Sequence, residues 1–268
     1  MTDAAAPPGG TPQPLVRVAS DRGVATITLD SPHNRNALSS VLTAQLLSAI
    51  AAAEADDRVR VIVLSHAGPV FCSGVDLKET AAAVGAGTVP AARLGDVLAA
   101  IWECPKPVVA RVGGPARAGG VGLVAAADIA VCAADTTFAF TEVRLGVIPA
   151  VISSTVLPRL APRAAAELFL TGDVFDGLRA AAIGLVTRAV PREELDATVA
   201  SYVASVMRGA PAALAAAKSL TRRPAAVSIR ENLAELTDMS VRFFTSAEGR
   251  EGVAAFAEKR DPSWVPAA

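Results

Sequence analysis

The hydrophobic pattern at the start of the chain predicts two strands followed by a helix. Two short runs rich in β-branched residues, at 15–19 (LVRVA) and 24–29 (VATITL), flank the turn-forming residues 20–23 (SDRG). Two such runs joined by a Gly-containing turn indicate a β-hairpin. From 39 to 55 the apolar residues recur at helical spacing, and the serines that open this stretch can cap a helix.

The alternation of strands and helices continues along the chain. Strands are expected at 59–65, 107–112, 128–133 and 136–140, and helices near 94–103 and 119–127. Because strands alternate with helices, the sequence predicts an α/β fold.

Beyond Val190 the pattern changes. The remaining residues have no strand-like run, and they are expected to form successive helices interrupted at 209–211 (GAP) and 223–224 (RP). The sequence therefore predicts a core at 15–195, which holds the active site, and a helical region at 196–268.

Residues 1–14 are mostly Ala, Pro and Gly with almost nothing to bury, so we expect a disordered lead there. They have neither the basic nor the apolar part of a secretory signal. No later apolar run reaches the roughly 18 residues typical of a membrane span. These features predict a cytoplasmic protein that does not enter a membrane.

Charge and cysteine content narrow the possible functions. Lys plus Arg total 25 and Asp plus Glu total 26, so no overall positive field favours nucleic acid. The three cysteines, Cys72, Cys104 and Cys132, lack metal-ligand spacing, and only His33 and His66 could assist them. We expect reduced thiols and no metal site.

Glycines cluster at 112–123 (VGGPARAGGVGL), where a helix is expected to begin. Unpaired N–H groups and the positive end of the helix dipole would suit an oxyanion or a phosphate there. Residues 120–125 (GVGLVA) also fit a dinucleotide-binding pattern, with Glu142 at about the distance of a ribose-binding acid. That pattern requires glycines at the turn from strand to helix, whereas these would fall inside the helix, so nicotinamide binding is the weaker interpretation.

Two other segments could carry chemistry. The Gly-containing loop at 71–79 (FCSGVDLKE) follows a strand, although by itself it resembles many ordinary loops. In the segment 138–149, Glu142 leaves a strand among apolar neighbours, which would raise its carboxyl pKa toward a value useful for proton transfer. A surface glutamate paired with Arg144 or another cation is the alternative.

Taken together, these segments resemble the crotonase (enoyl-CoA hydratase/isomerase) family from about Leu15 to Trp264. The likeness is carried by SPHNRNAL at 31–38, FCSGVDLKE at 71–79, LTGDVFDGLRAAAIGLVTRAVP at 170–191 and EGVAAFAEKRDPSW at 251–264. The resemblance implies a spiral of ββα units followed by a C-terminal helical trimerisation region. It also implies an enzyme that stabilises the enolate of an acyl-CoA thioester without a separate cofactor, because coenzyme A is part of the substrate.

The resemblance assigns roles to individual residues. The oxyanion hole would be formed by the backbone N–H groups of Ser73 and Gly119, and a single donor of this kind is worth roughly 3 to 4 kcal/mol. Glu142 would be the acid/base. The residues that would shape the substrate-binding loops are Cys72, Gly74, Asp76 and Gly120, with Cys72 as an apolar filler and Asp76 as a structural hydrogen-bond acceptor.

Gly122 departs from the family pattern, because the hydratases usually carry the first of two glutamates there. A single carboxylate suits a 3-enoyl to 2-enoyl isomerase, in which one base takes a proton from C2 and returns it at C4. The run 141–153 nevertheless resembles hydratases of branched or carboxylated enoyl-CoAs, such as methylglutaconyl-type substrates, which also carry Gly there. An enoyl-CoA hydratase is therefore the first hypothesis, an isomerase the second and a noncatalytic acyl-CoA binder the third.

Three basic residues could contact the substrate. Arg117 could bind a substrate carboxylate or a CoA phosphate bidentately, or be a solvated loop residue. Lys259 and Arg260 could reach the CoA phosphates of their own or a neighbouring subunit, or be exposed helix charges. The resemblance implies a homotrimer or a dimer of trimers.

Overall fold

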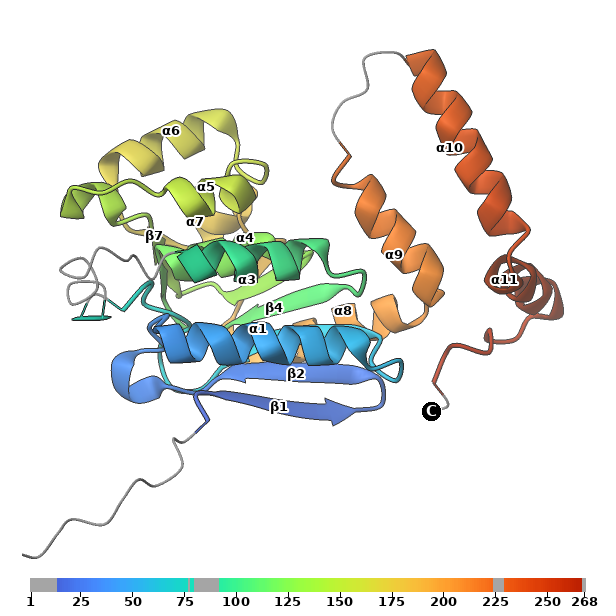
Figure 1. Cartoon of the computed structure of the whole chain (residues 1–268), viewed down its shortest axis with the longest axis horizontal. Coiled ribbons are helices and arrows are strands. Elements are labelled where there is room, and N and C mark those ends of the chain that lie inside the picture. Colours follow the sequence, from blue (N-terminus) through green and yellow to red (C-terminus); the bar gives the residue numbers. More distant parts are fainter. Residues whose placement is uncertain (1–13, 77, 80–91, 224–228, 267–268) are drawn as a thin grey trace, which may run out of the picture.

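The computed structural model describes residues 14–76, 78–79, 92–223 and 229–266. Figure 1 shows a layered body of helices and strands, from which the last helices extend to one side. This arrangement confirms the α/β fold class. In the described part of the chain, no helix is both long and apolar enough to cross a membrane.

The centre of the described body is a six-stranded sheet in the order β1-β2-β3-β4-β6-β9. The pair β1 and β2 is antiparallel, and every other pair is parallel. The strands are β1 (Val16–Asp21), β2 (Val24–Leu29), β3 (Val61–His66), β4 (Val108–Val112), β6 (Ile129–Ala133) and β9 (Arg188–Val190). Strands β3 and β4 are buried along most of their length, as expected of parallel strands covered on both faces.

The hairpin turn is shorter than the sequence predicts. Asp21 pairs with Val24, so Ser20 and Asp21 belong to the strand and the turn consists of Arg22 and Gly23 alone. Both turn residues have positive φ, 42° for Arg22 and 83° for Gly23. Two-residue turns of this kind match the twist of the strands they join, which explains why the ladder continues to Asp21.

Two hydrophobic cores lie on opposite faces of the sheet. Ile62 and Leu64 belong to one core, and Val61 and Val63 to the other, because successive side chains of a strand point to opposite faces. The helices on the first face are α1 (Ser40–Ala55), α3 (Ala92–Glu103) and α4 (Gly119–Ala126), and the helix on the second is α8 (Leu195–Met207). The helical region expected from residue 196 thus begins with a helix that packs on the sheet.

A second, three-stranded sheet was not foreseen from the sequence. It joins β5 (Ala116–Arg117), β7 (Thr137–Ala139) and β8 (Phe175–Asp176), and β5 runs parallel to β7. Strand β7 lies within the run predicted at 136–140, whereas β5 and β8, with two residues each, are too short to give a periodic pattern. The elements around it are the 3-10 helix η2 (Glu142–Leu145), α5 (Ala150–Val156), α6 (Pro162–Thr171) and α7 (Gly177–Ala182).

The described part of the chain ends with helices, as predicted. They are α9 (Pro211–Leu220), α10 (Ile229–Phe244) and α11 (Ala247–Glu258). Two further 3-10 turns lie earlier in the chain: η1 (Pro32–Asn34) follows β2, and η3 (Arg192–Glu194) leads into α8. Figure 1 shows α10 and α11 well away from the sheet. The break predicted at 209–211 separates α8 from α9, whereas the one at 223–224 extends outside the described residues.

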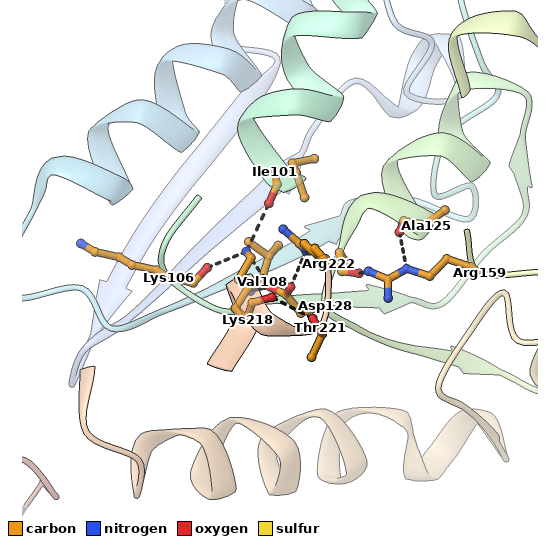
Figure 2. Close-up of polar contacts among 10 residues, drawn as sticks. Ile101, Lys106, Val108, Ala125, Asp128, Arg159, Lys218, Thr221 and Arg222 are labelled. Carbon is orange, nitrogen blue, oxygen red and sulfur yellow. Dashed lines mark hydrogen bonds and ion pairs between the residues drawn. The ribbon is translucent and has the colours of Figure 1, made fainter. Parts of the chain in front are cut away.

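A buried ionic cluster fastens the end of α9 to the body (Figure 2). The Lys218 ammonium lies 2.8 Å from an oxygen of Asp128 and donates to the carbonyl oxygens of Ile101 and Lys106. Arg222 pairs with the other Asp128 oxygen. The Arg222 guanidinium carbon also lies over the ring of Trp102, 4.3 Å from its centroid. Because both cations have hydrogen-bond partners, the cluster holds α9 in place without leaving a charge unpaired.

Candidate active site

Two loops meet where α4 begins. The backbones of Cys72 and Ala116 pair in an isolated parallel β-bridge, and the Arg117 N–H donates to the Cys72 carbonyl oxygen at 2.9 Å. Gly74 has a φ of 93°, and a Cβ built on it would lie 3.0 Å from Cβ of Ala118 and 3.7 Å from the Gly119 nitrogen. The loop that carries Ser73 therefore lies directly against the N-terminus of α4.

The two predicted oxyanion donors differ in their present partners. The Gly119 N–H opens α4 and has no acceptor among the described residues, as expected for the first turn of a helix. The preceding residue, Ala118, has a φ of 47°, a strained value that residues at functional sites can retain. The Ser73 N–H donates to the carbonyl oxygen of Arg35 at 3.1 Å. The Gly119 N–H is thus free to bind a substrate oxygen, whereas the Ser73 N–H would have to be shared between that oxygen and the Arg35 carbonyl.

Glu142 lies at the same end of the small sheet as Gly119. Strands β5 and β7 are parallel, so Gly119 after one and Glu142 after the other leave the sheet in the same direction. The carboxyl group is half-buried, and its Oε2 is buried without a partner among the described residues. Burial raises the pKa of Glu142, an effect that its own backbone N–H partly offsets. Arg144 pairs with Asp173, so the alternative of a Glu142–Arg144 surface pair is wrong.

Comparison with known proteins identifies the family. A sequence profile of the Enoyl-CoA hydratase/isomerase family matches residues 19–266. The chain belongs to the enoyl-CoA hydratase/isomerase family. It is 32% identical to a carnitinyl-CoA dehydratase of Salmonella arizonae over 259 residues, which cover 93% of this chain and 97% of that protein.

Solved structures agree with this membership of the enoyl-CoA hydratase/isomerase family. Pseudomonas aeruginosa AtuE has a TM-score of 0.89 at 33% identity, over 94% of this chain and 100% of that one. An enoyl-CoA hydratase from Mycobacterium avium is 45% identical, with a TM-score of 0.70 over 93% of this chain and 98% of that one. The likeness includes nearly the full length of both proteins and confirms the crotonase fold.

The loop residues of this enoyl-CoA hydratase/isomerase family member act through packing and backbone contacts. Cys72 is fully buried, and burial raises the pKa of its thiol to about 12. Gly120 lies against it, because a Cβ at that position would be 2.7 Å from Cβ of Cys72. Asp76 accepts hydrogen bonds from the backbone N–H groups of Lys78 and Glu79. Cys72 therefore fills apolar space in the core, and Asp76 accepts hydrogen bonds that hold the loop.

The structure provides no side chain at position 122 for a second carboxylate. Gly120 and Gly122 lie inside α4, which is the placement that disfavours a dinucleotide site. The residues at 80–91, outside the described part, include no Asp or Glu that could replace the missing acid. Among the described residues no cluster of three or more metal-ligating side chains is present, and the absence of a metal or cofactor stays a prediction.

Arg117 and Lys259 are not brought to this site in the described chain. The Arg117 guanidinium donates to the carbonyl and hydroxyl oxygens of Thr137 and to the carbonyl of Ala116, so it fastens β5 to β7. Lys259 is exposed at the end of α11, and Arg260 pairs with Glu251 and Glu258. Contacts from these residues to substrate, including that of a neighbouring subunit, stay predictions.

Sequence reasoning missed Asn36 as an organising residue. Asn36 is fully buried, accepts from the Ser31 N–H and donates to the carbonyls of Ala67 and Val70. It thereby ties the 31–38 turn to the loop that leads into Ser73. Its positive φ of 53°, which Asn tolerates better than most residues, agrees with its place in the turn NRNAL, and this was the available signal.

Proposed function

We propose that this protein hydrates the double bond of a 2-enoyl-CoA thioester with Glu142 as acid/base. The supporting observation is the half-buried Glu142, whose raised pKa and unpartnered oxygen suit proton transfer, at the same end of the small sheet as the open Gly119 N–H. Relatives named as hydratases and a dehydratase favour the same reaction class. Loops that hold Ser73 and Gly119 together would let both N–H groups bind the thioester oxygen.

A single carboxyl group can serve both halves of this addition. Ionised Glu142 takes a proton from a water molecule while the oxygen of that water bonds to C3. The electron pair of the double bond then moves through C2 onto the thioester oxygen. The negative charge is stabilised by the N–H groups and the positive end of α4. The protonated Glu142 then delivers the proton to C2, which restores the thioester carbonyl.

The isomerase alternative is favoured by one observation, the lack of a side chain at Gly122. In that reaction Glu142 takes a proton from C2 of a 3-enoyl-CoA and returns it at C4, so that no water has to be oriented. A noncatalytic acyl-CoA binder would instead bind the thioester without converting either substrate.

Turnover of crotonyl-CoA separates the alternatives. The purified chain should decrease the ultraviolet absorbance of the conjugated thioester, with a product heavier by one water in mass spectrometry. An increase in that absorbance from a 3-enoyl-CoA, without hydration, would establish the isomerase. Binding without either change would support the noncatalytic hypothesis.

Replacing Glu142 tests its role. Glu142→Gln keeps the shape but cannot accept the proton, so turnover should fall by roughly 100- to 10,000-fold while the affinity for butyryl-CoA is retained. The matched control is Glu193→Gln, the same change at an exposed position, which should leave kinetics unaltered. Unchanged turnover in Glu142→Gln would remove Glu142 from the mechanism.

A further inference from the structure

Gly122 and Ile152 are packed so closely that no side chain fits at position 122. A Cβ atom built on Gly122 would lie 2.6 Å from Cγ2 and 3.1 Å from Cβ of Ile152, and 3.4 Å from Cδ2 of Leu98. Packed carbon atoms rest at about 3.5 to 4.0 Å. The branched side chain of Ile152 therefore already occupies the volume that a residue larger than Gly would need.

Helix geometry shows where this volume lies. Gly122 follows Gly119 by about one turn of α4, and Cα–Cβ bonds in a helix tilt toward its N-terminus. A side chain at 122 would therefore lean toward the helix end at which the thioester oxygen is proposed to bind. Ile152 presents a methyl group there instead. Leu38 and Leu94 approach the same turn, at 2.9 Å and 3.1 Å from a Cβ built on Gly119.

The position of Ile152 is fixed by its surroundings. Ile152 is 2% exposed, and its helix α5 contacts both α3 and α4. The Thr155 hydroxyl lies 3.2 Å from the carbonyl oxygen of Gly122 and 3.2 Å from that of Ile152, so it can donate to either. When the hydroxyl donates to Gly122, it ties α5 to α4, so Ile152 cannot move away from Gly122 without breaking this bond.

We infer that Ile152 is a specificity-determining residue: packed behind the acyl site, it fills the space that a carboxylate at position 122 would otherwise take, so a bulkier acyl group gains no room there. This inference rests on the proposed function for the location of the thioester. Water is then oriented by Glu142 without help from α4. The substrate class is a 2-enoyl-CoA whose carbons next to the double bond carry hydrogen or alkyl substituents, because a charged group against Ile152 and Leu98 would lose its hydration.

The packing part of the inference is tested by a double-mutant cycle on thermal stability. Gly122→Ala adds only the Cβ, and it should lower Tm by roughly 3 to 10 °C despite the better helix propensity of Ala. In an Ile152→Ala background the same substitution should lower Tm little or raise it. Equal effects in both backgrounds would overturn the inference, because they would show that positions 122 and 152 do not compete for space.

The specificity part is tested with acyl-CoA ligands of different bulk. Ile152→Ala should shift the preference for 3-methylbutyryl-CoA over butyryl-CoA, measured as a ratio of dissociation constants, by about tenfold toward the branched ligand. The kcat/KM ratio of the matching 2-enoyl-CoAs should shift likewise. Val151→Ala, a smaller truncation in the same helix at a residue that is 36% exposed, is the control and should leave both ratios unchanged.

The outcomes distinguish the two proposals. A shift in binding ratio without turnover of any enoyl-CoA by the unaltered protein would contradict the proposed function and leave Ile152 as the selector of the acyl group. Normal turnover together with unchanged ratios in Ile152→Ala would overturn the role of Ile152 and leave the function standing.

Discussion

Burial moves the protonation of Glu142 and His66 in opposite directions. It raises the pKa of the Glu142 carboxyl, because the ionised form loses hydration. It lowers the pKa of His66 to about 4, with the nearby Arg111 acting in the same sense. His66 is therefore neutral near pH 7, and its Nε2 accepts a hydrogen bond from the Gly113 N–H at 3.0 Å.

The pH dependence of turnover should report the raised pKa of Glu142. Hydration begins with ionised Glu142, so kcat/KM should fall as the pH is lowered through a pKa above the ordinary value of 4.5. Initial rates with crotonyl-CoA across the acid range measure this limb, and circular dichroism at each pH verifies that the protein is folded. A decrease in kcat/KM whose midpoint lies at or below pH 4.5 would contradict the mechanism.

His66 should make the protein sensitive to acid. Its folded pKa of about 4 lies below the ordinary 6.5, so its contribution to stability is complete above pH 6.5 and is lost as the pH falls to 4. The loss is at most about 3 kcal/mol. Urea unfolding at several pH values measures it. His66→Gln, which can still accept from Gly113, should weaken this pH dependence, and an identical dependence in the variant would exclude His66 as its source.

At the scale of elements, the oxyanion site depends on the path of the backbone. Gly74 has a φ of 93°, and a Cβ there would lie 3.2 Å from the Arg117 carbonyl oxygen. Gly74→Ala should therefore displace the Ser73 N–H and reduce kcat by roughly 100-fold, the effect of losing one oxyanion donor. Strain at this φ should also lower the free energy of unfolding by about 1 to 3 kcal/mol.

Ser73→Ala is the matched control for Gly74→Ala. It changes a side chain in the same loop but leaves the N–H in place, so its kcat should stay close to that of the unaltered protein. A large loss in Ser73→Ala, with little change in Gly74→Ala, would show that the Ser73 hydroxyl acts in the reaction and that the backbone does not.

At the scale of the whole molecule, the C-terminal helices expose large apolar side chains. Leu233 and Val241 on α10 are 55% and 56% exposed, and Val253 and Phe256 on α11 are 56% and 87% exposed. Large exposed apolar side chains commonly mark contacts between subunits when they form a patch. The expectation of a homotrimer or a dimer of trimers is compatible with this surface.

The oligomer is tested by the native mass. Light scattering should give three or six times the 27.2 kDa of the chain. The double substitution Val253→Ser and Phe256→Ser should lower this mass, because it removes apolar contact area without touching the α/β body. Val18→Ser, the same kind of change on the exposed side of β1, is the control. A native mass of 27.2 kDa for the unaltered chain would contradict the prediction.

Local sequence patterns were sufficient to predict most of the helices and strands. The helix after residue 39 and a serine cap at Ser39 or Ser40 were predicted from hydrophobic spacing and the two serines alone. The structure places the cap at Ser39, whose hydroxyl accepts from the Leu42 N–H. The extent of β1 was wrong by two residues, because ladder hydrogen bonds to β2 override the turn preference of Ser20 and Asp21. Strand β7 lies within the run predicted at 136–140, whereas β5 and β8 could not be predicted, since runs of two residues carry no period.

The sequence by itself determined the α/β class, the family and the placement of Glu142 at the end of a strand, because periodicity and ordered motifs are local properties of the chain. Tertiary structure alone decided that Ser73 donates to Arg35, that Arg117 binds Thr137 and that Ile152 fills the space beside Gly122. Each of these contacts joins segments far apart in sequence. Their geometry depends on how whole elements pack, which no local pattern records.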